Sequence, residues 1–206
     1  MPIEMKLALS IGFCLIVFVH CLLSQEKFLL QCNERILLES RKMVLQQVGT
    51  LEATNRNDGT KIRLYQKAVG LSVGSPYCVA GQYFCFLRAV EVLGFSLKCV
   101  PLPKTGLSLE VFRFARLNGE KVPTKYEQDD IVIWIKGNTI HGHTERIVEV
   151  GRKGWVETVG FNTRRYDTKK GKWVEGVFRW KRNLLHPLGR MYLIGIVGFK
   201  RKSDGC

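Results

Sequence analysis

The sequence predicts an α+β domain, because segments with helical periodicity come first and short strand-like segments follow. Residues 34–50 (ERILLESRKMVLQQVGT) place apolar residues at spacings near three and four, which is typical of an amphipathic helix. From residue 130 onwards five short segments (DIVIWIK, RIVEV, GWVETVGF, VEGVFRW and MYLIGIVGF) are rich in β-branched and aromatic residues and are separated by turn residues. We therefore expect N-terminal helices that pack on a C-terminal antiparallel sheet.

The N-terminus carries an uncharged apolar run, residues 7–24 (LALSIGFCLIVFVHCLLS). It is hydrophobic on all sides, so we expect it to enter a membrane. Its length lies between a signal-peptide core and a full transmembrane span, so cleavage and retention as an anchor both stay open. Leu22 and Ser24 match the small-residue cleavage pattern poorly, which favours an anchor. A lipid on Cys21, or a buried core helix, is a weaker alternative.

These observations divide the chain of 206 residues into three parts. Residues 1–24 are a signal peptide or membrane anchor, residues 25–40 a linker and the start of the first helix, and residues 41–206 the globular domain. We expect export to the periplasm or cell envelope, or anchoring to the inner membrane by the N-terminal segment.

The chain has a formal net charge of +14, which favours polyanionic partners. Nucleic acid, anionic lipid and anionic cell-wall polymer all fit this charge. No RNP-type strand, zinc-finger spacing or basic region followed by heptads is present, so we expect no nucleic-acid partner. The basic stretch 164–173 (RRYDTKKGKW) predicts a charged hairpin turn, either a solvated loop or a glycan contact.

The seven cysteines contain no C-x-x-C pair, which argues against a zinc site or a thioredoxin-like site. If the first two leave with a cleaved leader, five remain. An odd number in an exported protein indicates at least one free thiol.

The segment 52–61 (EATNRNDGTK) is rich in residues that form turns or cap helices, and we expect a short helix from Thr60 to Val69 after it. A calcium loop is an alternative, although the closing bidentate Glu is missing. A mostly buried helix follows, with Ser75 as its cap, Pro76 in the first helical position and Gly94 at its end.

This placement puts Cys78 in the first turn of that helix. A helix N-terminus lowers the pKa of a cysteine, because unpaired N–H groups and the helix dipole favour the thiolate. The same N–H groups can help to form an oxyanion hole. A cysteine in an apolar helix is more often a small buried hydrophobe, and that interpretation fits Cys85 better than Cys78.

A nucleophile needs a base, and outside the leader only three histidines are present. His141 and His143 begin a predicted strand, whereas His186 lies in a turn. A metal site at the H-x-H pair lacks a third ligand at a suitable spacing, so we expect no metal. Asn162 follows the next apolar strand, and its amide could orient the imidazole as in Cys-His-Asn enzymes; a hairpin turn residue is the simpler alternative.

Three blocks of this sequence resemble the CHAP-type amidases and endopeptidases of bacteria and phages, a branch of the NlpC-like, papain-like fold. They are VGTLEATNRNDGTKIRLYQKAVGLSVGSPYCVAGQYFCF, then DDIVIW with HGHTERIVEV, and GWVETVGFNT, within about residues 41–198. The resemblance implies Cys78 as nucleophile, His143 as base and Asn162 as the orienting residue. We also expect Tyr77, Asn57 and His141 to bind substrate.

The sequence departs from this family at two places. Many members carry a Glu two residues before the Asn, where this chain has Gly160, so a further carboxylate is absent or is supplied elsewhere. Glu157 is three residues before Gly160, so in a regular strand its side chain points to the opposite face and cannot simply replace that carboxylate. The segment after His143 carries Glu145 and Arg146 where a small residue is usual.

What the resemblance implies is a CHAP-like cysteine hydrolase that cleaves an amide in peptidoglycan without a cofactor. Its partners would be peptidoglycan and, through an uncleaved N-terminal segment, the membrane, and we expect a monomer. Two alternatives are a catalytically inactive wall-binding or assembly module of the same fold and an amidase of small conjugates.

Overall fold

The computed structural model describes residues 25–205, and their fold is α+β. The elements are β1 (Glu26–Asn33), α2 (Glu34–Gln47), α3 (Thr60–Ala68), α4 (Cys78–Val92), the 3-10 helix η1 (Leu97–Cys99), α5 (Ser108–Asn118), β2 (Glu120–Val122), β3 (Ile131–Ile135), β4 (Gly142–Val150), β5 (Trp155–Asp167), β6 (Lys172–Asn183) and β7 (Tyr192–Lys202). The helices predicted around residues 34–50 and 60–69 and the five predicted strand segments are confirmed.

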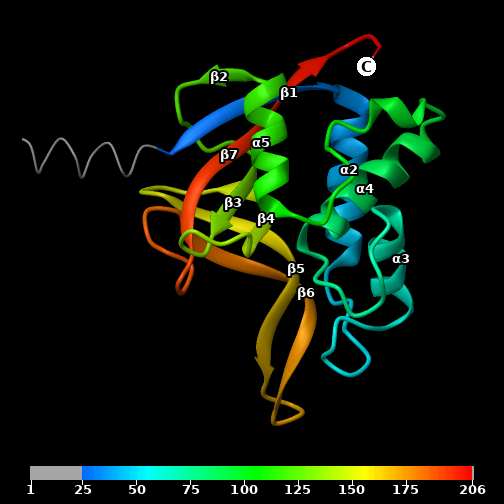
Figure 1. Cartoon of the computed structure of the whole chain (residues 1–206), viewed down its shortest axis with the longest axis vertical. Helices are drawn as coiled ribbons and strands as arrows, with labels where there is room; N and C mark the ends of the chain where they lie inside the picture. Colours follow the sequence, from blue (N-terminus) through cyan, green and yellow to red (C-terminus); the bar gives the residue numbers. More distant parts are fainter. Residues whose placement is uncertain (1–24, 206) are drawn as a thin grey trace, which may run out of the picture.

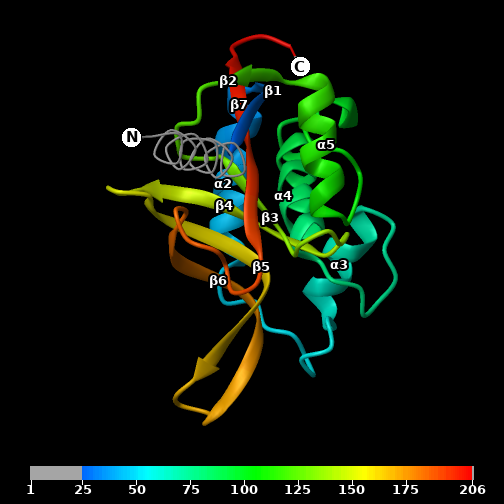
Figure 2. The same ribbon diagram turned by 60° about the vertical axis from the view of Figure 1, so that its left-hand side comes forward.

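The seven strands form one sheet in the order β2-β1-β7-β3-β4-β5-β6. Neighbouring strands are antiparallel except β1 and β7, which run parallel, so the sheet is mixed and not purely antiparallel as predicted. The helices gather beside this sheet (Figure 1). The tip of the β5–β6 hairpin, which contains the basic stretch 164–173, extends beyond the rest of the domain (Figure 2).

Residues 25–40 were predicted to be a linker and the start of the first helix; α2 does begin within them, but strand β1 stands where the linker was expected. Phe28, Leu30 and Cys32 alternate along it and are all buried, which is the period of a strand with one face in a core. Asn33 then ends the strand, and its side chain accepts a hydrogen bond from the N–H of Arg35 at 2.9 Å, so that α2 begins at once. The linker is therefore a core strand.

Helix α4 is the most buried helix and packs closely against β5. A Cβ atom placed on Gly81 would lie 2.1 Å from the ring of Phe161, so only glycine permits this approach. The helix begins at Cys78, and Pro76 lies in the preceding loop instead of in the first helical position. The helix ends at Val92, followed by Gly94 with a φ of 70°. The close packing sets the position of Cys78 relative to the sheet.

Strand β4 is attached to α2 by a buried arginine. Arg146 is fully buried, and its Nη2 donates to Asp129 Oδ1 at 2.8 Å while Nη1 donates to Ser40 Oγ at 2.9 Å. Arg41 on α2 also pairs with Asp129. Removing one member of such a buried pair costs about 3–5 kcal/mol. The unusual Arg146 therefore has a structural role, holding the strand that carries His143.

No helix within residues 25–205 is long and apolar enough to cross a membrane. The expected leader or anchor, residues 1–24, lies outside the described part of the chain, and so does Cys21.

Candidate active site

Cys78 is the first residue of α4, so the predicted position at a helix N-terminus is confirmed. Its side chain is buried, and burial alone would raise the pKa of the thiol. Hydrogen bonds from His143, from Ser108 and from the N–H of Val79 outweigh burial and lower this pKa. Cys85 lies two turns further along the same helix, and burial strongly raises the pKa of its thiol. Of these two thiols, Cys78 is the one poised to ionise.

The imidazole of His143 faces this sulfur. Burial would lower the pKa of the imidazole, but the hydrogen bonds to Cys78 and Glu145 outweigh it and raise the pKa to about 9. The two shifts have opposite directions, because a thiolate stabilises an imidazolium and the imidazolium stabilises the thiolate. Both shifts favour a thiolate–imidazolium pair, which is the reactive form of a catalytic cysteine.

Glu145 is the residue that orients the imidazole. Its Oε1 lies 3.1 Å from Nε2 of His143, two residues earlier on β4 and on the same face of the strand. Since Nε2 bonds to Glu145, Nδ1 is left for the sulfur of Cys78. Arg182 Nη2 donates to the same carboxylate at 2.6 Å, and the hydroxyl of Thr158 also donates to it.

The charge of Glu145 is balanced although its side chain is fully buried. Burial would raise the pKa of the carboxyl group, but the hydrogen bonds from His143 and Arg182 lower it to about 2. Glu145 therefore stays ionised at neutral pH, with the imidazolium on one side and the guanidinium on the other. A carboxylate in this position fixes the tautomer of the histidine and stabilises its charged form.

Gly160 lies directly opposite Glu145 on the neighbouring strand β5. A Cβ atom at Gly160 would come within 2.8 Å of Glu145 Oε1, so the glutamate occupies the space that a side chain at position 160 would enter. Many members of the family that the sequence resembles were expected to carry a Glu at this position. In this chain the carboxylate comes from β4 instead of β5, and Gly160 makes room for it.

Asn162 does not orient the histidine, which corrects the predicted role. Its Oδ1 accepts from the backbone N–H of Tyr77 at 3.3 Å, and its Nδ2 donates to Asn57 Oδ1 at 2.5 Å and to Glu52 Oε1 at 3.4 Å. The reason is a register shift between Gly160 and Thr163, where Asn162 takes a φ of 57°. The irregularity breaks the regular alternation of β5, and Asn162 bonds to the loop before Cys78.

Two predicted substrate-binding residues belong to the same network. Tyr77 has an exposed fraction of 0 %, and its hydroxyl donates to Glu52 Oε1 at 2.9 Å, so its side chain is part of the core and does not face a substrate. Asn57 is half-buried, and its Nδ2 donates to the carbonyl oxygen of Gly74 at 3.0 Å. Both residues hold the loop that leads to Cys78.

His141, the third predicted substrate-binding residue, lies in the exposed turn between β3 and β4. Its N–H donates to Thr139 Oγ1 at 3.2 Å, and its carbonyl oxygen accepts from Lys136. Strand β4 begins one residue later, so His141 does not share a regular strand with His143. Among residues 25–205, no group of three or more His, Cys, Asp or Glu side chains is placed to hold a metal ion.

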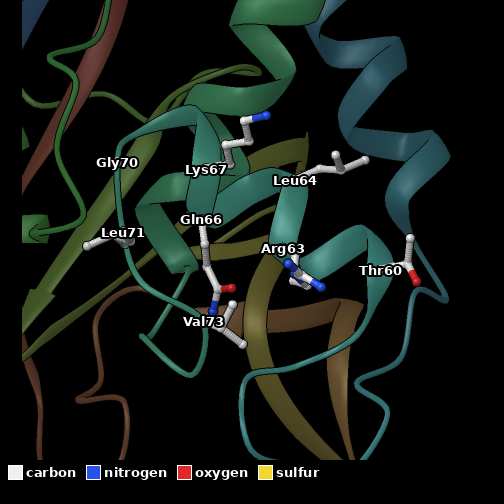
Figure 3. A pocket seen from close by; sticks show the side chains of 8 residues that line it. All are labelled: Thr60, Arg63, Leu64, Gln66, Lys67, Gly70, Leu71 and Val73. Atoms are coloured by element: carbon white, nitrogen blue, oxygen red, sulfur yellow. The ribbon is translucent and has the colours of Figure 1, made fainter.

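A cavity of about 540 Å³ lies beside α3 and the loop that follows it (Figure 3). Its lining residues are Thr60, Arg63, Leu64, Gln66, Lys67, Gly70, Leu71 and Val73. Gln66 connects it to the site, because its Nε2 donates to the carbonyl oxygens of Asn57 and Ser75, both at 2.8 Å. None of the Cys78, His143 and Glu145 side chains lines the cavity, so it borders the loop before Cys78 and not these three side chains.

Comparison of the chain with models of protein families, with curated proteins and with solved structures finds no match. The site is therefore defined by its own geometry. Sequence reasoning pointed to Cys78 and His143, which the structure brings together, but it gave Glu145 no role beside them. The signal was present, because residues two apart on a strand share a face and a carboxylate at that spacing can reach the imidazole.

We expect Asn162→Ala to slow turnover by about tenfold and to lower the free energy of unfolding by about 2 kcal/mol. The change removes the bond to the N–H of Tyr77 and places alanine at a positive φ, so the loop before Cys78 loses its support. The matched control is Asn55→Ala, because Asn55 has a φ of 58° but braces the β5–β6 hairpin. Kinetics and thermal melts of both variants test this prediction; equal turnover in the two would contradict it.

Proposed function

We propose that this chain is a cysteine-dependent hydrolase of papain-like fold that cleaves an amide bond in peptidoglycan. The observation that carries the chemical part of this proposal is the arrangement of Cys78, His143 and Glu145 at the start of α4, with a lowered thiol pKa and a raised imidazole pKa. The resemblance to CHAP-type sequences supports the fold and the substrate. No cofactor takes part in the proposed reaction.

In the proposed reaction the thiolate of Cys78 attacks the carbonyl carbon of the amide. The N–H of Val79, which bonds the sulfur in the resting state, lies at the helix N-terminus where N–H groups can stabilise the oxyanion. His143 donates its proton to the nitrogen of the leaving amine, and a thioester forms between Cys78 and the acyl group. His143 then removes a proton from water, which attacks the thioester and regenerates the thiol.

The surface supports an anionic polymer as the substrate. The net charge of +14 attracts polyanions. The protruding β5–β6 hairpin presents Tyr166 and Trp173, which are 50 % and 51 % exposed, and Arg164 stacks over the Trp173 ring at 4.6 Å. Exposed aromatic rings beside cations are suited to sugar rings with anionic groups. A monomer exported to the envelope, or tethered to the membrane through residues 1–24, would meet such a polymer.

The alternative of a catalytically inactive wall-binding module rested on Gly160. That argument weakens because Glu145 provides a carboxylate to His143 from the neighbouring strand. The buried, charge-balanced arrangement favours an enzyme over an inactive module.

Digestion of defined muropeptides tests the proposed function. We expect the purified chain to release fragments that mass spectrometry assigns to one broken amide, either between the sugar lactyl group and L-Ala or within the peptide. Peptidoglycan that stays intact with the folded chain under conditions where Cys78 reacts with an alkylating reagent would refute the substrate assignment.

The pH dependence of hydrolysis should be bell-shaped. On the acid side kcat/KM rises as Cys78 loses its proton, with a midpoint below the ordinary thiol pKa of about 8.5, because the folded protein lowers this pKa. On the alkaline side it falls around pH 9, where His143 loses the proton that it must donate to the leaving amine. Measurement of kcat/KM against pH checks both limbs; a rate that still rises above pH 9 would rule out His143 as the acid.

A further inference from the structure

Ser108 lies beside the sulfur of Cys78, although no sequence motif pointed to it. It is the first residue of α5, and its side chain is buried, with an exposed fraction of 3 %. Its Oγ is 3.8 Å from Cys78 Sγ. Two helices therefore begin at the same place, one with the thiol in its first position and the other with a hydroxyl.

The fold holds Ser108 in this position from two sides. A Cβ atom on Gly142 would lie 3.1 Å from Ser108 Cβ and 2.6 Å from the carbonyl oxygen of Trp134, so only glycine allows β4 to pass this close to α5. On the other side, Gly106 in the loop before α5 packs against the side chain of Leu71. Because Gly142 immediately precedes His143, the contact that places Ser108 also places the base.

The chemistry of Ser108 and Cys78 determines which of them donates the hydrogen bond between them. A serine hydroxyl can donate or accept a hydrogen bond, whereas a thiolate can only accept. When Cys78 is ionised, the hydroxyl of Ser108 must donate to the sulfur. His143 is the titratable group that faces this sulfur, with Glu145 and Arg182 behind it. Ser108 adds a donor that carries no charge and does not titrate near neutral pH.

We propose that Ser108 is a further catalytic residue, which donates a hydrogen bond to the Cys78 thiolate and keeps it ionised. This role rests on Cys78 as the nucleophile of the proposed function, but it does not depend on which amide is cleaved. The lowered pKa of Cys78 agrees with it, since the Ser108 hydrogen bond is among its causes. The sulfur then has two side-chain donors, the imidazolium of His143 and the hydroxyl of Ser108, beside the backbone N–H of Val79.

The rate of alkylation of Cys78 by iodoacetamide at different pH values tests the proposal, with the modified peptide quantified by mass spectrometry. In Ser108→Ala we expect the midpoint to move up by about one pH unit, since a hydrogen bond to a charged group is lost. Ser108→Thr keeps the hydroxyl and should restore a midpoint close to that of the wild type. Ser96→Ala is the control, because Ser96 also stands at a helix start but caps η1 away from Cys78.

An unchanged midpoint in a folded Ser108→Ala variant overturns the proposal, and so does a Ser108→Thr variant that behaves like the alanine variant. If Ser108→Ala fails to fold, the titration of the Cys78 thiolate is followed by its ultraviolet absorbance in the wild type and in Ser108→Thr. Both proteins have a hydroxyl at position 108, so the proposal requires the same midpoint in both, and different midpoints overturn it. A shifted midpoint together with intact muropeptides would support Ser108 and refute only the proposed substrate.

Discussion

Cys78→Ala is expected to abolish hydrolysis of peptidoglycan, with a loss on the order of 10⁶-fold in kcat, as is typical when the nucleophile of a triad is removed. The reason is that no other described thiol can replace it. Cys32 and Cys85 are buried, and burial raises the pKa of both thiols, Cys32 to about 12. The measurement is fragment release from defined muropeptides over a time course.

The matched control for this experiment is Cys85→Ala. Cys85 lies on the same helix and is fully buried, and the charged group that acts on the pKa of its thiol is Arg146, not His143. Its loss should lower the thermal stability through the cavity that it leaves and should leave turnover near the wild-type level. Turnover by Cys78→Ala at the wild-type rate would exclude Cys78 as the nucleophile, provided that thermal melts show both variants folded.

The position of Cys78 could be predicted because its signals are local. The start of α4 follows from turn residues and a continuous apolar segment, and a helix start favours a thiolate wherever it occurs. The strands β3 to β7 follow from short apolar segments between turns in the same way. His143 could be chosen because few histidines are present outside the leader.

Strand β1 and the role of Glu145 could not be predicted from local patterns, because they depend on contacts between distant segments. Strand β1 pairs in parallel with β7 at the far end of the chain, so its eight residues alone look like the start of a helix or a linker. The role of Glu145 depends on the register of β4 against β5, which brings Gly160 opposite the carboxylate. Because His143 and Glu145 are two residues apart on one strand, the sequence shows that their side chains share a face of the sheet. It does not show that Cys78 lies against that face.

The error at Asn162 has a physical origin in the backbone. A regular β5 would place Asn162 on the face of Gly160 and so towards Glu145 and His143. The register shift after Gly160 and the left-handed conformation of Asn162 break this alternation. The amide then supports the loop before the nucleophile, so a residue predicted to orient the base supports the thiol instead.

Glu145→Gln is expected to lower kcat/KM by about 100-fold to 10,000-fold, because an amide of the same shape cannot stabilise the imidazolium. The pKa of His143 should fall from about 9, since the carboxylate raises it. The alkaline limb of the pH profile would then move to lower pH. A variant that only disturbs packing would lose activity at every pH without this movement, so the profile separates the two effects.

Moving the carboxylate back to β5 gives a stricter test of the same role. In Glu145→Ala the carboxylate is lost, and Gly160→Glu in the same chain would offer a new one from the residue directly opposite. Of the three atoms nearest to a Cβ at position 160, the two that belong to Glu145 are then gone, and the methyl group of Thr163 is the one that must shift. We expect kcat/KM of the double variant to be at least about tenfold higher than that of Glu145→Ala.

The control is Gly160→Glu alone, which should be inactive, because two carboxylates would compete for one buried space beside a single histidine and Arg182. Equal activity of Glu145→Ala and the folded double variant would mean that the imidazole needs Glu145 itself, held by Arg182 and Thr158, and not only a carboxylate in that space.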